Sequence, residues 1–555
     1  MQYAPYHCAL KNNIFFNMKK LLPFLLAFLP LLVIAQAPQP VSERPLYDIK
    51  SIGEIKLTIP SKNWTDALDS LRIYGDGMIT GAALVDGHQY ESVGIRYRGD
   101  KSYQLNLKRN PFSIKLNHNN KDQNHQGYTS LKISSSLRDP SMVREVLFYE
   151  IAGRYMAAPK VSYTKLFVNE EYIGLFVNVE SVDAQFTQKR FGSMGHPFFK
   201  AGVDYKPEIP LSCKQNIAGS LEYEADIKCF KGSFEINSPQ GWETLQELTR
   251  VLNNDPKNIQ QILDVDKTLW MLALNNVMVN LSSYTGNAMN YYLYQDNFGR
   301  FQPVHWDLNL SFGGLKNTGS GSDLELRDLQ RLDPLLHIDN ALRPLIKQLL
   351  ADELNKKMYL NHIDQIVREN FKNGAYEKRA QELQAMIVVP FVDDKYKTYS
   401  LSDFQNSIKT TVGKKSKIPG IVELMEARTK YLTSHPELTA LASTISGVTV
   451  QSRAKFESTK VEGFRITAKA DRFPKRMWVC YRTKADQPFF QMQMEEEQSK
   501  KATSGERLYM ANLPGDGEDT VLEYYLMVEN AGAVSFSPSN YTMAPVKVKL
   551  KDLNK

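Results

Sequence analysis

The chain has 555 residues, with 68 Lys and Arg against 61 Asp and Glu and a formal net charge of +7 at pH 7. This balance neither favours nor excludes an anionic partner, and the short basic stretch 412–420 is typical of a solvated turn, so no nucleic-acid partner is expected. The length exceeds one ordinary hydrophobic core, so two or three domains are expected. No G-x-S-x-G, H-E-x-x-H, Walker or Rossmann pattern occurs, which argues against the enzyme classes that those motifs mark.

Residues 18–35 have the composition of a secretory signal peptide. Two lysines precede an apolar core of about a dozen residues, and Ala35 stands at the expected cleavage site. The apolar run is too short for a membrane span, and polar residues follow it. We therefore expect residues 1–35 to be removed and the mature chain to be exported, to the periplasm or out of the cell, without a transmembrane segment. Because the cationic region begins only at Met18, translation starts either at Met1 or at Met18.

Three cysteines remain in the expected mature chain: Cys213, Cys229 and Cys480. In an oxidising compartment, Cys213 and Cys229 can close a local loop. Cys480 alternates with aromatic residues as strand residues do, and we expect it to stay reduced. Spacing alone does not prove this pairing.

A Pro-rich lead over residues 36–53 precedes a region with the two-residue period of β-strands. Within 78–99, an Asp-Gly pair at Asp86-Gly87 separates two such runs, which is the pattern of a tight hairpin. The second run divides its residues between two faces, with Val93, Ile95 and Tyr97 on one and Arg96 and Arg98 on the other. The run 111–117, "PFSIKLN", repeats this alternation.

The stretch 138–156 predicts a helix. Asp139 is expected to be its N-cap and Pro140 its first helical residue, before an apolar stripe at helical spacing. Two more strands are expected at 162–168 and 172–180, joined by a tight turn. Strands, then one helix, then strands predict an α+β lobe with a mostly antiparallel sheet.

From about residue 242 the pattern becomes helical, as at 241–254 and 267–283. A hairpin at 289–307 interrupts the helices, which resume as far as 421–434. His435-Pro436 is expected to end the last helix, because the residue before a proline disfavours the helical conformation.

Residues 436–447 have the composition of a linker. Beyond them, short strand patterns alternate with turn residues, which predicts an immunoglobulin-like or fibronectin-like β-sandwich over 448–555. The expected strands are 464–470, 477–483, 489–494, 507–513, 521–530 and 545–550.

Ordered motifs along the chain resemble one family. They are "GIRYRGDKS", "FSIKLN", "DPSMVREVLFYEIAGRYM", "LFVNEEYIGLFVNVESVDAQFTQKRFG" and "NYYLYQDNFGRFQPVHWDLNLSFGG". Together they resemble the CotH family of atypical kinases, named after a spore-coat protein, over about residues 54–434. The resemblance implies an atypical protein-kinase-like fold with two lobes over 54–435. It also implies ATP with Mg²⁺ or Mn²⁺ as cofactors, and phosphorylation of Ser or Thr in secreted or cell-envelope proteins.

Phosphoryl transfer needs a cation near the nucleotide phosphates. With the resemblance, the best candidate is Lys115, on the polar face of its strand; without it, Lys115 would be a solvated strand residue. With the resemblance, Glu145 on the following helix would pair with Lys115 as the helix glutamate pairs with the strand lysine in kinase folds; without it, Glu145 would be a solvated residue of a surface helix. Arg98 and Lys101 are further candidate phosphate contacts. Glu180 matches a family position, where a role beside the nucleotide competes with a role at a helix cap.

Asp307 matches the Trp-Asp motif of the family, in which the carboxylate is the expected metal ligand. The family commonly has a second Asp two residues later, where this chain has Asn309. An amide oxygen can coordinate Mg²⁺ but adds no negative charge. Kinase-active members carry another Asp before the hairpin, and the matching position here is Ser282 or Ser283. A serine hydroxyl is a poor general base without a His or Lys beside it.

Two functions from different classes therefore stay open. The first is an exported, ATP-dependent and metal-dependent protein kinase. The second is a catalytically impaired pseudokinase that acts as an envelope or extracellular binding or assembly protein, with the C-terminal sandwich as its docking module. The scarcity of ATP outside the cytoplasm favours the second.

Overall fold

The computed structural model describes residues 43–554, apart from 76, 100, 101, 204–206, 215, 415, 455–460 and 498–504. The expected signal peptide at 1–35 lies outside the described residues, and so does Lys101. Within the described part of the chain, no helix is both long enough and apolar enough to span a membrane.

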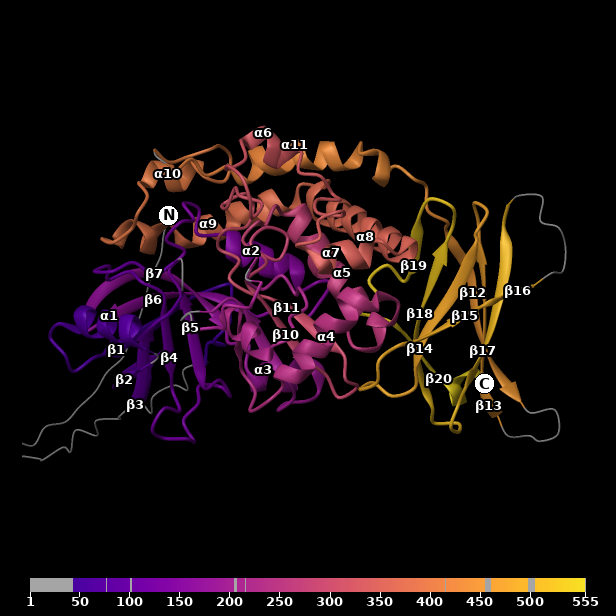
Figure 1. Cartoon of the computed structure of the whole chain (residues 1–555), viewed down its shortest axis with the longest axis horizontal. Helices are drawn as coiled ribbons and strands as arrows, with labels where there is room; N and C mark the ends of the chain where they lie inside the picture. Colours follow the sequence, from indigo (N-terminus) through magenta and orange to yellow (C-terminus); the bar gives the residue numbers. More distant parts are fainter. Residues whose placement is uncertain are drawn as a thin grey trace, which may run out of the picture. The chain divides into compact units, whose positions relative to one another are not determined.

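The first strands of the chain close into a barrel, drawn in indigo and purple in Figure 1. They pair in the order β1-β2-β3-β4-β5-β7-β6 with antiparallel neighbours, and a parallel pairing of β6 with β1 closes the barrel. The antiparallel sheet is confirmed, whereas its closure was not predicted. The strands are β1 (Ile52–Thr58), β2 (Ile79–Val85), β3 (His88–Tyr97), β4 (Phe112–Lys115), β5 (Ser130–Ser134), β6 (Val161–Val168) and β7 (Glu171–Glu180), and helix α1 (Trp64–Tyr74) joins β1 to β2.

Alternation along the strands decides which side chains fill the barrel. Val93 and Ile95 on β3 are fully buried, as are Phe112 and Ile114 on β4, and all belong to one hydrophobic cluster. Burial of an aliphatic or aromatic side chain contributes about 1.5–3 kcal/mol, so this face determines the register of the strands. Arg98 and its neighbour Arg96 lie on the opposite face, as predicted.

The predicted Asp-Gly turn joins β2 to β3. Asp86 and Gly87 have φ of 46° and 88°, the left-handed conformation that a tight hairpin requires at both positions. The Asp86 carboxylate also accepts a hydrogen bond from the backbone N–H of Glu54 at 2.7 Å and pairs with Arg44 at 3.0 Å. These contacts explain why an aspartate suits this turn.

Helix α2 (Arg144–Ala152) begins later than predicted. The side chain of Asp139 accepts hydrogen bonds from the backbone N–H of Ser141 at 2.9 Å and of Arg144 at 3.0 Å, and it pairs with the Arg144 guanidinium at 3.1 Å. Met142 has a φ of 60°, which is outside the helical region. The chain therefore forms a loop around Asp139 before the helix starts, and Pro140 is not a helical residue.

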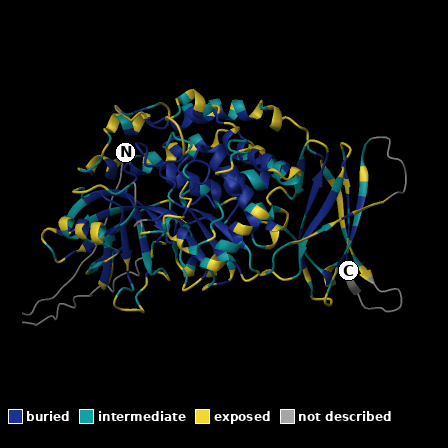
Figure 2. Cartoon of the chain, viewed as in Figure 1, coloured by how far each residue is buried: buried dark blue, intermediate teal, exposed yellow. Residues whose placement is uncertain are grey.

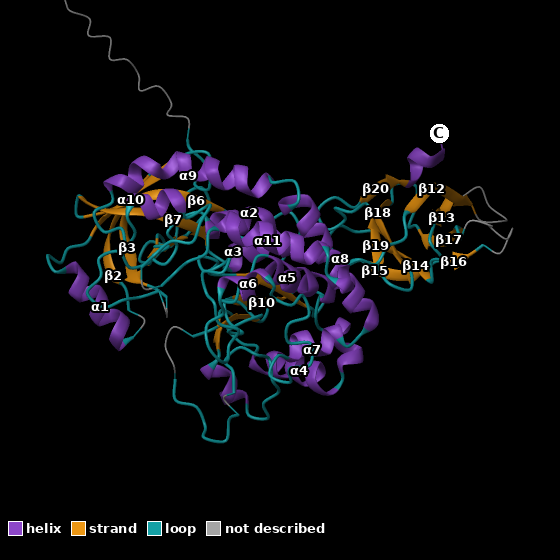
Figure 3. Cartoon of the chain, turned by 90° about the horizontal axis from the view of Figure 1, so that it is seen from above, coloured by secondary structure: helices purple, strands orange, loops and turns teal. Residues whose placement is uncertain are grey.

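A second sheet follows, with strand order β11-β10-β8-β9. Its strands are β8 (Phe198–Ala201), β9 (Phe234–Ile236), β10 (Tyr291–Gln295) and β11 (Phe301–His305), so the predicted hairpin at 289–307 is confirmed. Most of the helices of Figure 3 belong to this part of the chain. They are α3 (Ala184–Phe191), α4 (Trp242–Asn254), α5 (Val265–Val277), α6 (Leu326–Gln330), α7 (Pro344–Leu350), α8 (Glu353–Ile366), α9 (Ala375–Asp393), α10 (Leu401–Asn406) and α11 (Ile421–Thr433).

Helix α5 is buried among the other helices, where Figure 2 shows mostly dark blue. It ends at Val277, earlier than the predicted end at 283. Val279 has a φ of 44°, and the backbone N–H of Asn280 donates to the carbonyl of Asn275 at 2.8 Å, which closes the helix. The residues after α5 therefore form a loop, and this loop carries Ser282.

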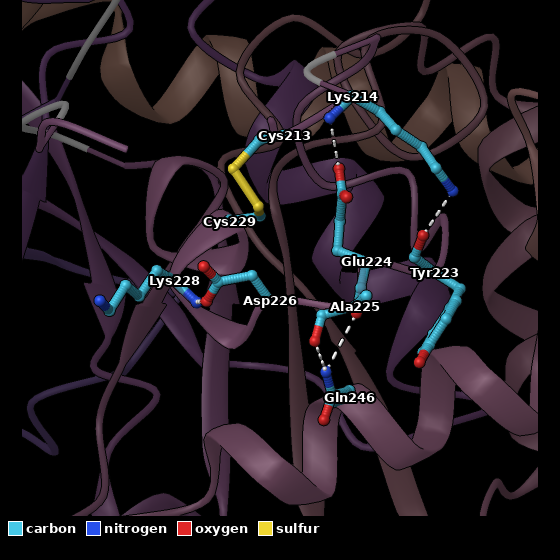
Figure 4. The surroundings of a disulfide bond; sticks show 9 residues. All are labelled: Cys213, Lys214, Tyr223, Glu224, Ala225, Asp226, Lys228, Cys229 and Gln246. Atoms are coloured by element: carbon cyan, nitrogen blue, oxygen red, sulfur yellow. Dashed lines mark hydrogen bonds between the residues drawn. A yellow bond between two sulfur atoms is a disulfide. The ribbon is translucent and has the colours of Figure 1, made fainter. Parts of the chain in front are cut away.

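Cys213 and Cys229 form a disulfide bond, and Cys480 is free and buried, as the sequence predicts. The bond closes a loop between β8 and β9 (Figure 4). Near it, the backbone N–H of Lys214 donates to Glu224 at 2.8 Å. The side chain of Gln246, on α4, donates to the carbonyl of Glu224 at 3.1 Å. The loop is thus fastened to the helical region.

Two antiparallel sheets form the C-terminal part, after residue 445. All the strands expected from the sequence are present, and β12 begins at Ile445, before the expected start at 448. Buried residues of both sheets form one hydrophobic cluster. The first sheet contains β12 (Ile445–Ala454), β13 (Val461–Ala470), β17 (Arg507–Pro514) and β16 (Glu495–Glu496); the second contains β15 (Phe490–Gln493), β14 (Arg476–Arg482), β18 (Val521–Glu529), β19 (Val534–Ser537) and β20 (Val546–Lys549).

Buried polar contacts join the second C-terminal sheet and its loops to the helical region. The Tyr541 hydroxyl donates to Asp266 at 2.8 Å and accepts a hydrogen bond from the indole N–H of Trp270 at 3.2 Å. Lys357, on α8, pairs with Glu529 on β18 at 2.9 Å. Residues 44–555 accordingly form one compact unit.

Candidate functional site

Several of the predicted site residues line one cavity of about 170 Å³. Its walls come from the barrel strands β3, β4 and β5, from β8, β9 and β10 of the second sheet, and from the loops around residues 282–290 and 306–315. The predicted residues among them are Arg98, Ser282, Asp307 and Asn309. Closing the barrel and pairing the second sheet thus bring together residues that are far apart in the sequence.

Lys132, on β5, is the cation of this cavity that the sequence reasoning missed. Its ammonium donates to the hydroxyl of Ser113, the residue opposite it on β4, at 2.8 Å. Burial, and then the positive charges of Arg98, Arg96 and Lys200, lower the pKa of Lys132 to about 7. The signal was present in the sequence, because "SLKIS" alternates in the same way as "FSIKL".

Lys115, the cation that the sequence favours for the nucleotide phosphates, is not among the residues that line the cavity. It is the last residue of β4, opposite Ser130, and its side chain is exposed. Lys115 lies on the same face of β4 as Ser113 but two residues further along the strand. Lys115 therefore stands at the solvent-exposed end of its strand, outside the cavity that Lys132 lines from β5.

Glu145, on α2, is buried beside Asp307 and makes no ion pair with any described residue. Burial, and then the negative charge of Asp307, raise the pKa of Glu145 to about 7, although the Ser134 hydroxyl and the Leu308 N–H oppose the shift. One of its carboxyl oxygens has no hydrogen-bond partner among the described residues. The expected pairing of Glu145 with Lys115 is therefore absent.

Asp307 follows β11, with a φ of 52°. The side-chain amide of Asn309 donates a hydrogen bond to the Asp307 carboxylate. Just before them, Trp306 lies under the guanidinium of Arg98, 5.1 Å from the ring centre. Asp307 and Asn309 thus share one wall of the cavity and are hydrogen-bonded to each other.

Ser282 lies on the same wall, and Asn290 holds it in place. The side-chain amide of Asn290 donates to the Ser282 carbonyl at 2.8 Å and to its hydroxyl at 2.9 Å. The carbonyl of Asn290 accepts a hydrogen bond from the Trp306 N–H at 3.1 Å. Among the described residues, no His or Lys side chain is hydrogen-bonded to Ser282, so nothing here activates its hydroxyl as a base.

Glu180 is buried away from the cavity. Its carboxylate accepts a hydrogen bond from the Lys160 N–H at 2.9 Å and pairs with Arg190 at 3.4 Å. Asp183 is the N-cap of α3, accepting hydrogen bonds from Gln185 and Phe186. These contacts give Glu180 a structural role beside α3. The structure does not bring Glu180 close to the other predicted site residues.

The charges of the cavity suit phosphate groups better than a divalent metal ion. Its described lining has five basic side chains and two acidic ones, and one of these acids, Glu235, pairs with Lys200 at 3.0 Å. Among the described residues, no group of three or more His, Cys, Asp or Glu side chains is placed to hold a metal ion. Mg²⁺ is usually held by carboxylates. Asp307 and Asn309 supply one carboxylate and one neutral amide, and the nearby carboxyl of Glu145 has its pKa raised to about 7, so this is a weak donor set among these basic side chains for the metal that the resemblance implies.

A larger cavity, of about 1740 Å³, lies between the second C-terminal sheet and the helical region. None of the cavity-lining residues discussed above contributes to it. Aromatic residues, among them Phe489 and Tyr525, line its C-terminal wall, and their rings are 5.1 Å apart. The smaller cavity is the candidate site, because it combines the predicted residues with unbalanced charge.

Comparison with known proteins identifies the family of the chain. A family model described as CotH kinase protein matches residues 95–432, a span that contains every residue of the candidate site. No curated protein matches the chain. The matched span is more than half of the chain, and the chain therefore belongs to the CotH kinase protein family.

Proposed function

We propose that this chain is an exported nucleotide-binding protein of the CotH family, with an atypical kinase-like domain and an immunoglobulin-like C-terminal sandwich. In this proposal the cavity binds the phosphates of ATP. Phosphoryl transfer to Ser or Thr of secreted or envelope proteins is far slower than in a kinase with a complete set of acids. The chain then acts mainly as a binding or assembly protein in the envelope.

The observation that carries the proposal is the position of Lys132. Its ammonium and the guanidinium of Arg98 belong to the same cavity as Asp307, inside the span that matches the kinase family. Kinase chemistry requires a cation on the nucleotide phosphates. Lys132 meets this requirement from β5, since Lys115 is exposed at the end of β4.

Slow transfer follows from the groups that surround the acceptor position. A kinase uses a carboxylate to orient the acceptor hydroxyl and accept its proton. Here Ser282 stands at the matching position, and its hydroxyl accepts a hydrogen bond from Asn290. A neutral hydroxyl accepts a proton poorly near pH 7. Lys132 and Arg98 can hold and orient phosphate groups, but no described side chain beside Ser282 can take the proton.

Export is supported by two features. Residues 18–35 have the composition of a signal peptide. The Cys213–Cys229 disulfide suits an oxidising compartment, where such bonds form and persist.

The second candidate function is an active protein kinase, and the family match together with Asp307 favours it. Transfer of labelled phosphate from ATP distinguishes the two. We expect at most a trace of autophosphorylation by the wild-type chain and more by the double variant Ser282→Asp, Asn309→Asp, which restores both acids. Rapid transfer by the wild type that Asp307→Ala abolishes would establish the kinase instead. Binding of ATP, measured by calorimetry, tests the nucleotide site itself, and its absence would refute the proposed function.

A further inference from the structure

We propose that the cavity binds the phosphate chain of a nucleotide without a divalent metal ion, and that basic side chains supply the positive charge that Mg²⁺ supplies elsewhere. The inference rests on the proposed function and specifies its chemistry. It concerns this chain in particular, because Asn309 stands where the family commonly has a second Asp.

Lys132 has hydrogen-bond donors that no described residue uses. An ammonium group has three donors, and the only described acceptor at hydrogen-bond distance from this one is the hydroxyl of Ser113, at 2.8 Å. No described carboxylate pairs with Lys132. Two of its donors are therefore available to a ligand in the cavity.

Other positive charges surround the ammonium of Lys132 and repel it. Arg98, Arg96 and Lys200 all disfavour the charged form of Lys132, and the smaller effect of Asp183 opposes them. Glu235 compensates Lys200 in part, at 3.0 Å, and the ring of Trp306 holds the guanidinium of Arg98. An anion among these groups would relieve the repulsion, and it would raise the pKa of Lys132 on binding.

The same basic surroundings disfavour a divalent cation in the cavity. A metal ion at Asp307 would meet a carboxylate that already accepts a hydrogen bond from Asn309, and beside it the buried carboxyl of Glu145, whose pKa is raised to about 7. Asn309 adds no negative charge, and the basic side chains nearby would repel the metal. A phosphate chain therefore gains more from this cavity as the free anion than as its magnesium complex, which carries less negative charge.

The experiment is calorimetry on the mature chain, with ATP and with inorganic tripolyphosphate, each in EDTA and in excess Mg²⁺. We expect both ligands to bind in EDTA at least as tightly as in Mg²⁺. Lys132→Met should weaken binding about tenfold or more, because a charge-assisted hydrogen bond is lost. Lys115→Met is the matched control, an exposed lysine on the neighbouring strand, and should bind as the wild type does. Arg98→Gln provides a second cavity variant if Lys132→Met does not fold.

The outcomes separate the inference from the proposed function. Binding of ATP only with Mg²⁺ would overturn the inference and leave the proposed function standing. Binding of ATP but not of tripolyphosphate would also overturn it, because recognition would then lie in the nucleoside. Absence of binding under every condition would overturn both. Asn309→Asp adds a test of the mechanism, since the added carboxylate should make Mg²⁺ strengthen binding, and no effect of Mg²⁺ on this variant would contradict the role given to Asn309.

Discussion

Replacing Asp139 by alanine should destabilise the chain strongly, because it removes one partner of a buried ion pair. The side chains of Asp139 and Arg144 are both 0% exposed, and their nearest charged atoms are 3.1 Å apart. The Asp139 carboxylate also accepts hydrogen bonds from the Ser141 hydroxyl at 2.6 Å and from the Arg144 N–H at 3.0 Å. All of these contacts are lost in Asp139→Ala.

The magnitude follows from what remains around Arg144. Its guanidinium keeps hydrogen bonds to the carbonyls of Phe312 at 2.8 Å and Pro419 at 2.6 Å, but no carboxylate neutralises it. Leaving one charge of a buried pair without its partner costs about 3–5 kcal/mol. Asp139→Asn keeps the shape and one acceptor oxygen, so it should cost less than Asp139→Ala.

Urea unfolding followed by circular dichroism measures this loss. The control is Glu247→Ala, which breaks the exposed pair of Glu247 with Arg250, at 2.6 Å. An exposed pair contributes little to stability, because solvent screens its charges. A shift of the urea midpoint for Asp139→Ala no larger than that for Glu247→Ala would refute the reasoning.

Three further predictions concern other parts of the chain. Burial raises the pKa of Glu145 from 4.5 to about 7, so between these pH values the folded chain holds a proton that the unfolded chain has lost, and its stability falls as the pH rises. Glu145→Gln should therefore stabilise the folded chain above pH 7 by up to about 3 kcal/mol and change its stability little below pH 4.5, as urea titrations at several pH values would measure. Replacing Cys213 and Cys229 by serine should lower the free energy of unfolding by about 3 kcal/mol, read from the urea midpoint without reductant. Tyr541→Phe should cost about 1–3 kcal/mol, because Asp266 loses a buried donor, and an unchanged melting temperature would contradict the importance of this contact.

Local features of the fold could be predicted from the sequence. The hairpin at Asp86-Gly87 depends on two adjacent residues that tolerate positive φ. The β10–β11 hairpin and most helices likewise depend on short-range patterns. Helix ends were less predictable where longer-range contacts decide them. Asp139 binds both the backbone N–H and the guanidinium of Arg144, the first residue of α2, but the N-cap is Val143. Helix α5 ends where Asn280 bonds back to Asn275.

The candidate site was predicted in part, because its residues come together only when the barrel closes. Asp307 and Asn309 are near each other in sequence, and Ser282 was located by its motif position. The sequence favours Lys115 and misses Lys132, although both follow the same alternation on neighbouring strands. Pairing of β4 with β5 places Lys132 opposite Ser113, inside the cavity, and leaves Lys115 at the exposed end of its strand.

The most direct test of the account is the protection of Lys132 by a ligand. Acetylation of lysines in the mature chain, followed by mass spectrometry, reports the reactivity of each ammonium separately. The account predicts that ATP in EDTA slows the acetylation of Lys132 and leaves that of Lys115 unchanged, because of these two lysines Lys132 lines the cavity and Lys115 does not. Unchanged labelling of Lys132 at saturating ATP, or protection of Lys115 in its place, would contradict the central claim.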